Sequence, residues 1–423
     1  MKLKLIIFVA IILPLIAVSQ KDEKQKFGVT IGGFVRNDIT YNTRQVVSAR
    51  SESHVVLAPA PILLDREGND INAVSNFNII GLTTRLKLKI TGPDAFGAKT
   101  SGAIETDFLG SPDKFELRLR HAFVKLQWKS SSILIGQYWH PMWATECYPK
   151  AVSFGAGVPF NPLSRVPQIR YIKKLGSVSI LASIMSQGMF KSKGNPLAHQ
   201  NSSIPELHFQ LQYKNELISA GAGVNYQVLM PRTLTDSNFV TSQTISSLSY
   251  FAYFKTSLKP ITVKLYGMYG QSNDNLIMMG GYAIADKSYS PTQISKNFVD
   301  YTPYNTISTW LDIETNNSKF NLGLFAGYSK NLGSDDKVIV SSYTGRWGNV
   351  NSMMRIAPRA VLKSNKFVLS FEIEYSAMDY AEQEYDSNNN KIGDPNGIDS
   401  NGKVTHYVTA NNIKPMVSVS YHF

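Results

Sequence analysis

In segment after segment of this chain, apolar and polar residues alternate one by one, which is the period of a β-strand. The pattern is clear in LTTRLKLKI at 82–90, in LHFQLQYK at 207–214 and in FVLSFEIEY at 367–375. We find no long stretch with helical spacing between recognisable caps. The sequence therefore predicts an all-β fold whose strands have one apolar face and one polar face.

The connectors between the strands alternate in length. Turn signals divide the chain into about sixteen strands, expected near 27–41, 80–92, 98–110, 114–129, 131–140, 166–174, 176–188, 205–214, 216–229, 244–258, 260–272, 304–316, 317–332, 352–365, 366–380 and 410–423. Tight turns such as KSSS at 129–132 alternate with long polar loops, although the connector near Ser111 is short and breaks the rule. The long loops cover approximately 42–79, 141–165, 188–205, 272–304, 332–352 and 380–410. A soluble β-sandwich gives no reason for this asymmetry, whereas a transmembrane antiparallel β-barrel has long extracellular loops and short periplasmic turns.

The chain stops inside a strand. In VSVSYHF at 417–423, two valines, Tyr421 and Phe423 share one face of that strand. A loose final strand would expose a row of unpaired N–H and C=O groups, and in lipid each such group costs several kcal/mol. We therefore expect the last strand to close the barrel against the first, around FGVTIGGFV at 27–35.

The N-terminus has the features of a secretory signal. Lys2 and Lys4 precede an apolar stretch that Pro14 interrupts, and small residues follow it. This stretch is too short for a spanning helix, which needs about 20 apolar residues. The predicted organisation is a signal peptide at 1–19, a short linker at 20–26 and an outer-membrane β-barrel at 27–423.

Composition and motifs argue against several kinds of site. The single cysteine, Cys147, allows neither an internal disulfide nor a thiolate metal cluster, and the seven histidines have no paired metal spacing. DSNNNKIGD at 386–394 resembles a calcium loop, but Lys391 stands where an EF-hand needs glycine, so a solvated loop is favoured. The formal charge is +12, but the basic residues are interleaved with lipid-facing ones, which argues against nucleic-acid binding. No nucleophile elbow is present, and we expect no enzyme, no metal and no cofactor.

One strand changes phase. In FELRLRHAFVKLQW at 115–128, apolar residues occupy odd positions up to Leu119 and even positions from Val124 onward. An extra residue in a strand shifts every later side chain to the other face. We therefore expect a β-bulge near His121.

A barrel of about sixteen strands is wide enough to leave an aqueous channel. The loop 141–165 is rich in proline, glycine and aromatic residues and poor in charge, which suits folding into the lumen. The candidate constriction residues are charged residues of this loop and of predicted inward positions: Arg36, Arg85, Lys87, Arg118, Arg120, Glu146, Lys150, Arg165 and Arg170. Lys89 and the acids Asp38, Glu105, Asp107 and Glu116 are predicted to share that wall. The positive balance predicts a preference for anions; alternatively, the charges pair among themselves and only line a wet wall.

Several segments resemble the DcaP-like family of trimeric outer-membrane porins. They are IGGFVRNDITYNTR, LRHAFVKLQW, LIGQYWHPMW, GVPFNPLSRVPQIRY and the terminal Phe423, so the resemblance covers much of 27–175 and the final strand. It implies a homotrimer of sixteen-stranded channels for small hydrophilic, often anionic solutes, surrounded by outer-membrane lipid and lipopolysaccharide. It also implies that Tyr421 and Phe423 form a signal for the barrel-assembly machinery. The periplasmic coiled coil of many members is not expected, since only QKDEKQK precedes the barrel here.

The function predicted from these features is an outer-membrane porin for passive diffusion of small polar or anionic solutes. The main alternative is a structural or adhesive barrel whose extracellular loops bind a ligand.

Overall fold

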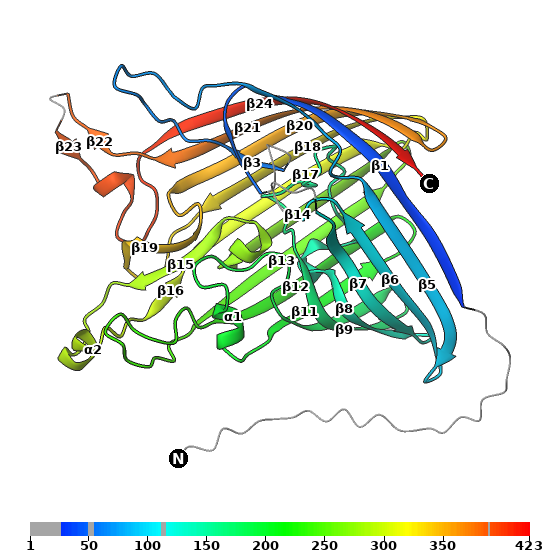
Figure 1. Cartoon of the computed structure of the whole chain (residues 1–423), viewed down its shortest axis with the longest axis horizontal. Coiled ribbons are helices and arrows are strands. Elements are labelled where there is room, and N and C mark those ends of the chain that lie inside the picture. The colour runs from blue at the N-terminus through cyan, green and yellow to red at the C-terminus, as the bar shows by residue number, and fades with distance from the viewer. Residues whose placement is uncertain (1–26, 50–54, 111–115, 388–389) are drawn as a thin grey trace, which may run out of the picture.

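The computed structural model describes residues 27–49, 55–110, 116–387 and 390–423. The predicted signal peptide at 1–19 and linker at 20–26 lie outside the described residues. Within the described part of the chain, no helix is long and apolar enough to cross a membrane. Most of these residues belong to strands, which Figure 1 shows wrapped around a common axis.

Sixteen antiparallel strands, which we call staves, form the wall of a closed barrel (Figure 1). The staves are β1 (Gly28–Asn42), β5 (Arg85–Ala95), β6 (Ala98–Asp107), β7 (Arg118–Gln127), β8 (Ser131–Trp139), β9 (Arg165–Leu175), β10 (Val178–Met185), β11 (Glu206–Lys214), β12 (Ile218–Leu229), β13 (Ile245–Ser257), β14 (Ile261–Gln271), β17 (Asn305–Thr315), β18 (Phe320–Asn331), β20 (Val350–Ser364), β21 (Phe367–Ala381) and β24 (Tyr407–His422). The short strand β4 (Asn76–Ile80) continues the stave of β5, because both pair with β1. The predicted fold class is confirmed, and each of the sixteen predicted strands overlaps one stave.

Short turns lie at one end of the barrel and longer connectors at the other; we name these the turn end and the loop end. The turns are 96–97, 128–130, 176–177, 215–217, 258–260, 316–319 and 365–366. The loops carry small elements: β2 (Val46–Ser48), β3 (Val56–Pro59), η1 (Pro141–Trp143), α1 (Ala198–Asn201), η2 (Asn273–Leu276), β15 (Gly280–Ala285), α2 (Pro291–Ser295), β16 (Tyr301–Pro303), β19 (Val338–Arg346), β22 (Glu384–Tyr385), β23 (Lys391–Ile392) and η3 (Pro395–Gly397). Of these, β15, β16 and β19 form a three-stranded sheet at the loop end. The predicted alternation of turns and loops is thus present.

The barrel closes where the last stave meets the first. The register runs from Phe34 opposite His422 to Thr40 opposite Met416, and Gly33 and Phe423 exchange two backbone hydrogen bonds of 3.2 Å. A Cβ atom on Gly33 would lie 2.1 Å from the carbonyl oxygen of Arg85 in the next stave. Only glycine therefore fits at this point of the seam, and the predicted pairing of first and last strands is confirmed.

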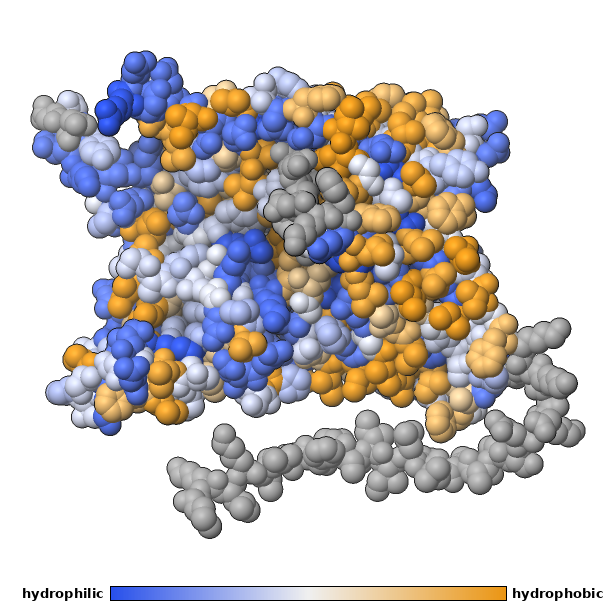
Figure 2. All heavy atoms as spheres, viewed as in Figure 1, coloured by the Kyte–Doolittle hydropathy of each residue, from blue (hydrophilic) through white to orange (hydrophobic). Residues whose placement is uncertain are grey.

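The polarity of the barrel's outer and inner faces varies around the wall. Apolar residues cover much of the outer surface over β5 and β6 in Figure 2, whereas hydrophilic residues gather at the loop end. In β13, the outward-facing Tyr250 and Phe254 are exposed, but the inward-facing Phe251 and Tyr253 are apolar too and only 4% exposed. This inner surface differs from the expected alternation because it packs against a loop rather than water.

The predicted bulge is present in β7. Glu105 of β6 lies opposite His121, and the next residue, Thr106, lies opposite Leu119, so Arg120 is the extra residue. The side-chain amide of Gln137 donates hydrogen bonds of 3.0 Å to the carbonyls of Leu119 and Arg120. Because of the bulge, the consecutive residues Arg120 and His121 both face Glu105 of β6, at 2.7 and 3.7 Å.

Candidate channel constriction

The loop 141–165 folds into the lumen and packs on one side of it. Its buried residues Met142, Ala144, Cys147 and Phe160 join an apolar cluster with Phe251, Tyr253, Tyr266, Met268, Trp310 and Phe325 of the wall. Two hydrogen bonds hold the loop on the same side of the lumen. Tyr266 donates to the carbonyl of Met142 at 3.1 Å, and the Trp310 indole donates to the Asn161 side chain at 3.0 Å. The inner aromatic surface of β13, β14, β17 and β18 therefore seats the loop.

The tip of this loop crosses the lumen. The backbone N–H of Lys150 donates to Asp312 at 3.2 Å, and those of Val152 and Ser153 donate to Glu372 at 2.7 Å each. From β1, which is separated from β21 by β24 alone, Arg36 donates to the carbonyl of Val152 at 2.6 Å. Staves β1, β17 and β21 thus hold one short segment between them.

Two cavities lie on either side of this tip. The outer cavity, of about 470 Å³, is lined by loop residues such as Met189 and Ile277 and by the walls of β1, β5, β7 and β9. The inner cavity, of about 450 Å³, is lined by the turn residues 315–317 and by the ends of β20 and β24. Arg36 and residues 150–152 line both cavities, so the tip of the loop separates the two halves of the lumen.

The described residues that line the outer cavity are basic rather than acidic where they are charged. They include Arg36, Arg85, Arg118, Arg120, Arg165 and Lys150, and no aspartate or glutamate of the described ranges is among them. The carboxylates lie behind the arginines: Asp107 contacts Arg118 at 2.5 Å and Arg120 at 2.7 Å, and Glu105 contacts Arg120 at 2.7 Å. Arg36 likewise pairs with Asp38 at 2.8 Å. The acids orient the guanidinium groups, and the cavity is left with their N–H donors.

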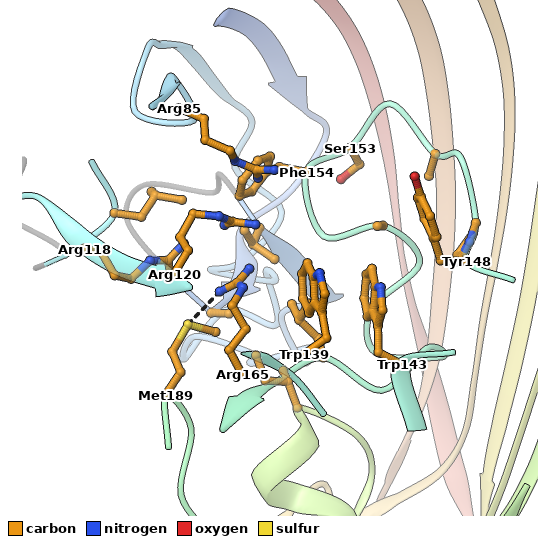
Figure 3. Close-up of a pocket in the computed structure, with 18 of the residues that line it drawn as sticks. Arg85, Arg118, Arg120, Trp139, Trp143, Tyr148, Ser153, Phe154, Arg165 and Met189 are labelled. Carbon is orange, nitrogen blue, oxygen red and sulfur yellow. Dashed lines mark hydrogen bonds between the residues drawn. The ribbon is translucent and has the colours of Figure 1, made fainter. Parts of the chain in front are cut away.

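Arg165 has a different environment from the other arginines. It forms no ion pair within the described residues; its guanidinium stacks 4.3 Å above the ring of Trp139 and donates to the sulfur of Met189. Trp139 stacks in turn on Trp143, with ring centroids 4.3 Å apart and planes 5° apart, and Trp143 stacks on Tyr148. Figure 3 shows this column opposite Arg85, Arg118 and Arg120. Arg165 is therefore held by aromatic faces, and no carboxylate among the described residues pairs with its positive charge.

Three of the predicted constriction residues do not line the outer cavity. Glu146 and Lys214 form a largely exposed ion pair of 2.7 Å near the turn end. Lys87 lies 3.9 Å from Glu105 and is 41% exposed. Arg170 is buried, and its guanidinium donates to Gln168 and to the carbonyl of Trp139. The other six predicted residues meet around one cavity.

Sequence reasoning missed the residues that hold the tip of the loop. Asp312 and Glu372 lie far along the chain and alternate with apolar neighbours like any inward polar residue. Asp312 also accepts from Lys264 at 3.0 Å and from Arg359 at 2.8 Å. Their one sequence signal is a carboxylate on the inward face of a stave, which does not reveal its partner. No group of three or more metal-binding side chains that could hold an ion occurs in the described ranges.

The reactivity of Cys147 measures how tightly the loop 141–165 packs against the wall. It is fully buried, its sulfur lies 3.6 Å from the carbonyl oxygen of Phe254, and burial raises the pKa of its thiol to about 12. We expect a thiol reagent at neutral pH to label it about a thousandfold more slowly than a free cysteine, whose pKa is about 8.5. Labelling should still accelerate with pH above 8.5, and denaturation should restore the ordinary rate. Mass spectrometry of folded and unfolded protein measures both; equal rates would contradict the seating.

No protein-family model matches the chain, and no curated protein matches it in sequence. Solved structures match its fold. The outer membrane channel DcaP of Acinetobacter baumannii matches with a TM-score of 0.66 and 15% identity over 94% of this chain and 97% of that one. OmpT, an outer membrane protein of Vibrio cholerae, matches with a TM-score of 0.54 and 10% identity over 96% and 99%, and its trimer form with 0.55 and 9% over 94% and 99%. The protein thus has the fold of these sixteen-stranded outer-membrane barrels, and its resemblance to the DcaP-like porins is confirmed at the level of the fold.

Proposed function

We propose that the protein is a porin, a channel for passive diffusion of small hydrophilic, anionic solutes across the outer membrane. The observation that carries this proposal is the lining of the outer cavity, to which the described part of the chain contributes five arginines and Lys150 but no carboxylate. Charged groups at close quarters set the selectivity of a pore, so an anion gains at this point and a cation is repelled. The similarity in fold to an outer membrane channel supports passage through the barrel.

The proposal includes how the protein is assembled. We infer a homotrimer, which the trimer form of a neighbour with the same fold supports. Tyr421 and Phe423 at the closing seam are exposed, which supports their role as a signal for the barrel-assembly machinery. Outer-membrane lipid and lipopolysaccharide would surround the apolar outer face.

Recording from planar bilayers tests the function. In a KCl gradient we expect conductance steps in groups of three and a reversal potential of the sign given by chloride. The preference should weaken as salt rises, because mobile ions screen the arginines. A reversal potential set by potassium would contradict the anionic part, and silence of a folded, heat-modifiable barrel would favour a structural or adhesive role.

A further inference from the structure

A buried carboxylate on the barrel wall is devoted to the tip of the loop 141–165. Glu372 in β21 is 2% exposed, and its two oxygens accept hydrogen bonds of 2.7 Å from the N–H groups of Val152 and Ser153. It forms no ion pair with any residue in the described ranges. Its neighbour on the same face, Glu374, contacts Arg355 at 3.4 Å and Lys414 at 3.2 Å. The amides of the loop are thus the direct partners of Glu372.

The physical chemistry of this contact links the wall to the loop. Hydrogen bonds to an ionised carboxylate are shorter and stronger than those between neutral groups, and two adjacent N–H groups form a concave site for an anion. Arg359 lies opposite Glu372 in the register of β20 and β21 but forms its ion pairs with Asp312 and Glu314, so the buried carboxylate of Glu372 relies on the loop donors for direct hydrogen bonds. Loop and wall therefore hold each other in place.

The same segment has a second contact with the wall, in β1, which is separated from β21 by β24 alone. Val152 donates its N–H to Glu372 in β21 and accepts from Arg36 in β1 through its carbonyl. Because Arg36 and residues 150–152 line both cavities, a shift of this segment changes the passage between them. The contacts of Val152 with Glu372 and Arg36 therefore bear on the passage between the two cavities.

We propose that Glu372 is the positioning residue of the constriction, which fixes the tip of the loop 141–165 across the lumen. This inference rests on the proposed channel function. Glu372 acts through the loop backbone and need not touch the solute. The role differs from that of the basic lining, which acts on the charge of the solute directly.

Glu372→Gln tests the proposal, because it keeps the shape of the side chain but leaves one acceptor oxygen and turns an NH₂ group toward a backbone N–H. We expect single-channel conductance to rise about twofold, with added noise from a loop that moves. Glu372→Asp keeps the charge and both acceptors, so its conductance should lie closer to wild type. Glu314→Gln is the control: it removes one negative charge from the inner cavity, where Glu314 contacts Lys264 and Arg359 but not the loop. An equal rise in the control, or none in Glu372→Gln, would overturn the proposal.

Labelling of Cys147 gives a second readout that does not depend on conduction. Release of the tip should expose this thiol and speed its reaction in folded Glu372→Gln at least about tenfold, with Cys147→Ser as the blank. An unchanged rate in a heat-modifiable barrel would show that Glu372 does not hold the loop. If wild type fails to conduct, the proposed function is wrong, and the labelling rates alone decide the role of Glu372.

Discussion

Replacing Arg118 and Arg120 together by glutamine is expected to shift the selectivity strongly toward cations. Arg85, Lys87, Arg118 and Arg120 form a group with Glu105 and Asp107, four positive charges against two negative, a balance of 4 − 2 = +2. The double variant leaves 2 − 2 = 0 and uncovers two carboxylates that the arginines now screen from the cavity. The reversal potential in a KCl gradient should then move toward potassium, by an amount that shrinks at high salt.

Arg165→Gln is the matched control for this experiment. Arg165 lines the same cavity but stacks on Trp139 and has no acidic partner in the described part of the chain. Its loss removes a positive charge without uncovering a negative one, so the anion preference should weaken and keep its sign. If the double variant and the control both retain the wild-type reversal potential, these arginines serve only to line a wet wall with paired charges.

Gly33→Val is expected to abolish a stable barrel. Its Cβ would lie 2.1 Å from the carbonyl oxygen of Arg85, a backbone atom of β5, which pairs with β1 on the side away from the closing seam. The clash cannot be relieved by turning a side chain, so we expect destabilisation above about 3 kcal/mol. Pairing of Gly33 with Phe423 would be lost as well. The measurement is the fraction of protein that migrates as a heat-modifiable barrel.

Gly267→Ala is the control for the seam variant. Gly267 also lies within a stave, but nothing lies within 4 Å of where its Cβ would be. Alanine there should leave the folded fraction unchanged, which separates the seam from a general intolerance of larger residues in strands. A folded Gly33→Val barrel would show that the seam can shift its register.

The staves, the closing pair and the bulge could be predicted because each follows from the alternation of neighbouring residues. The change of phase between Leu119 and Val124 located the bulge to within one residue of Arg120. Such local patterns survive in the fold because a slip of one residue would turn every side chain to the wrong face.

Partners across the lumen could not be predicted in the same way. The N–H of Val152 meets Glu372, which is 220 residues away, and Ser308 donates to the carbonyl of Phe160 across 148. The inner aromatic face of β13 could not be predicted from the sequence either, because an apolar residue such as Phe251 or Tyr253 can face lipid or a buried loop equally well. These contacts depend on how a loop folds back into a closed cylinder, which alternation along one strand does not encode.

The division of the lumen by the loop also has an electrical consequence. Among the described residues, all the charged side chains that line the outer cavity are cations, whereas the inner cavity combines Arg359 and Lys363 with Glu314. The energy profile for an ion then differs between the two directions of passage, because the ion meets the strongest field first from one side and last from the other. Equal and opposite voltages would then drive unequal currents. The channel would rectify, and the direction of larger current would depend on which way the barrel is inserted in the membrane.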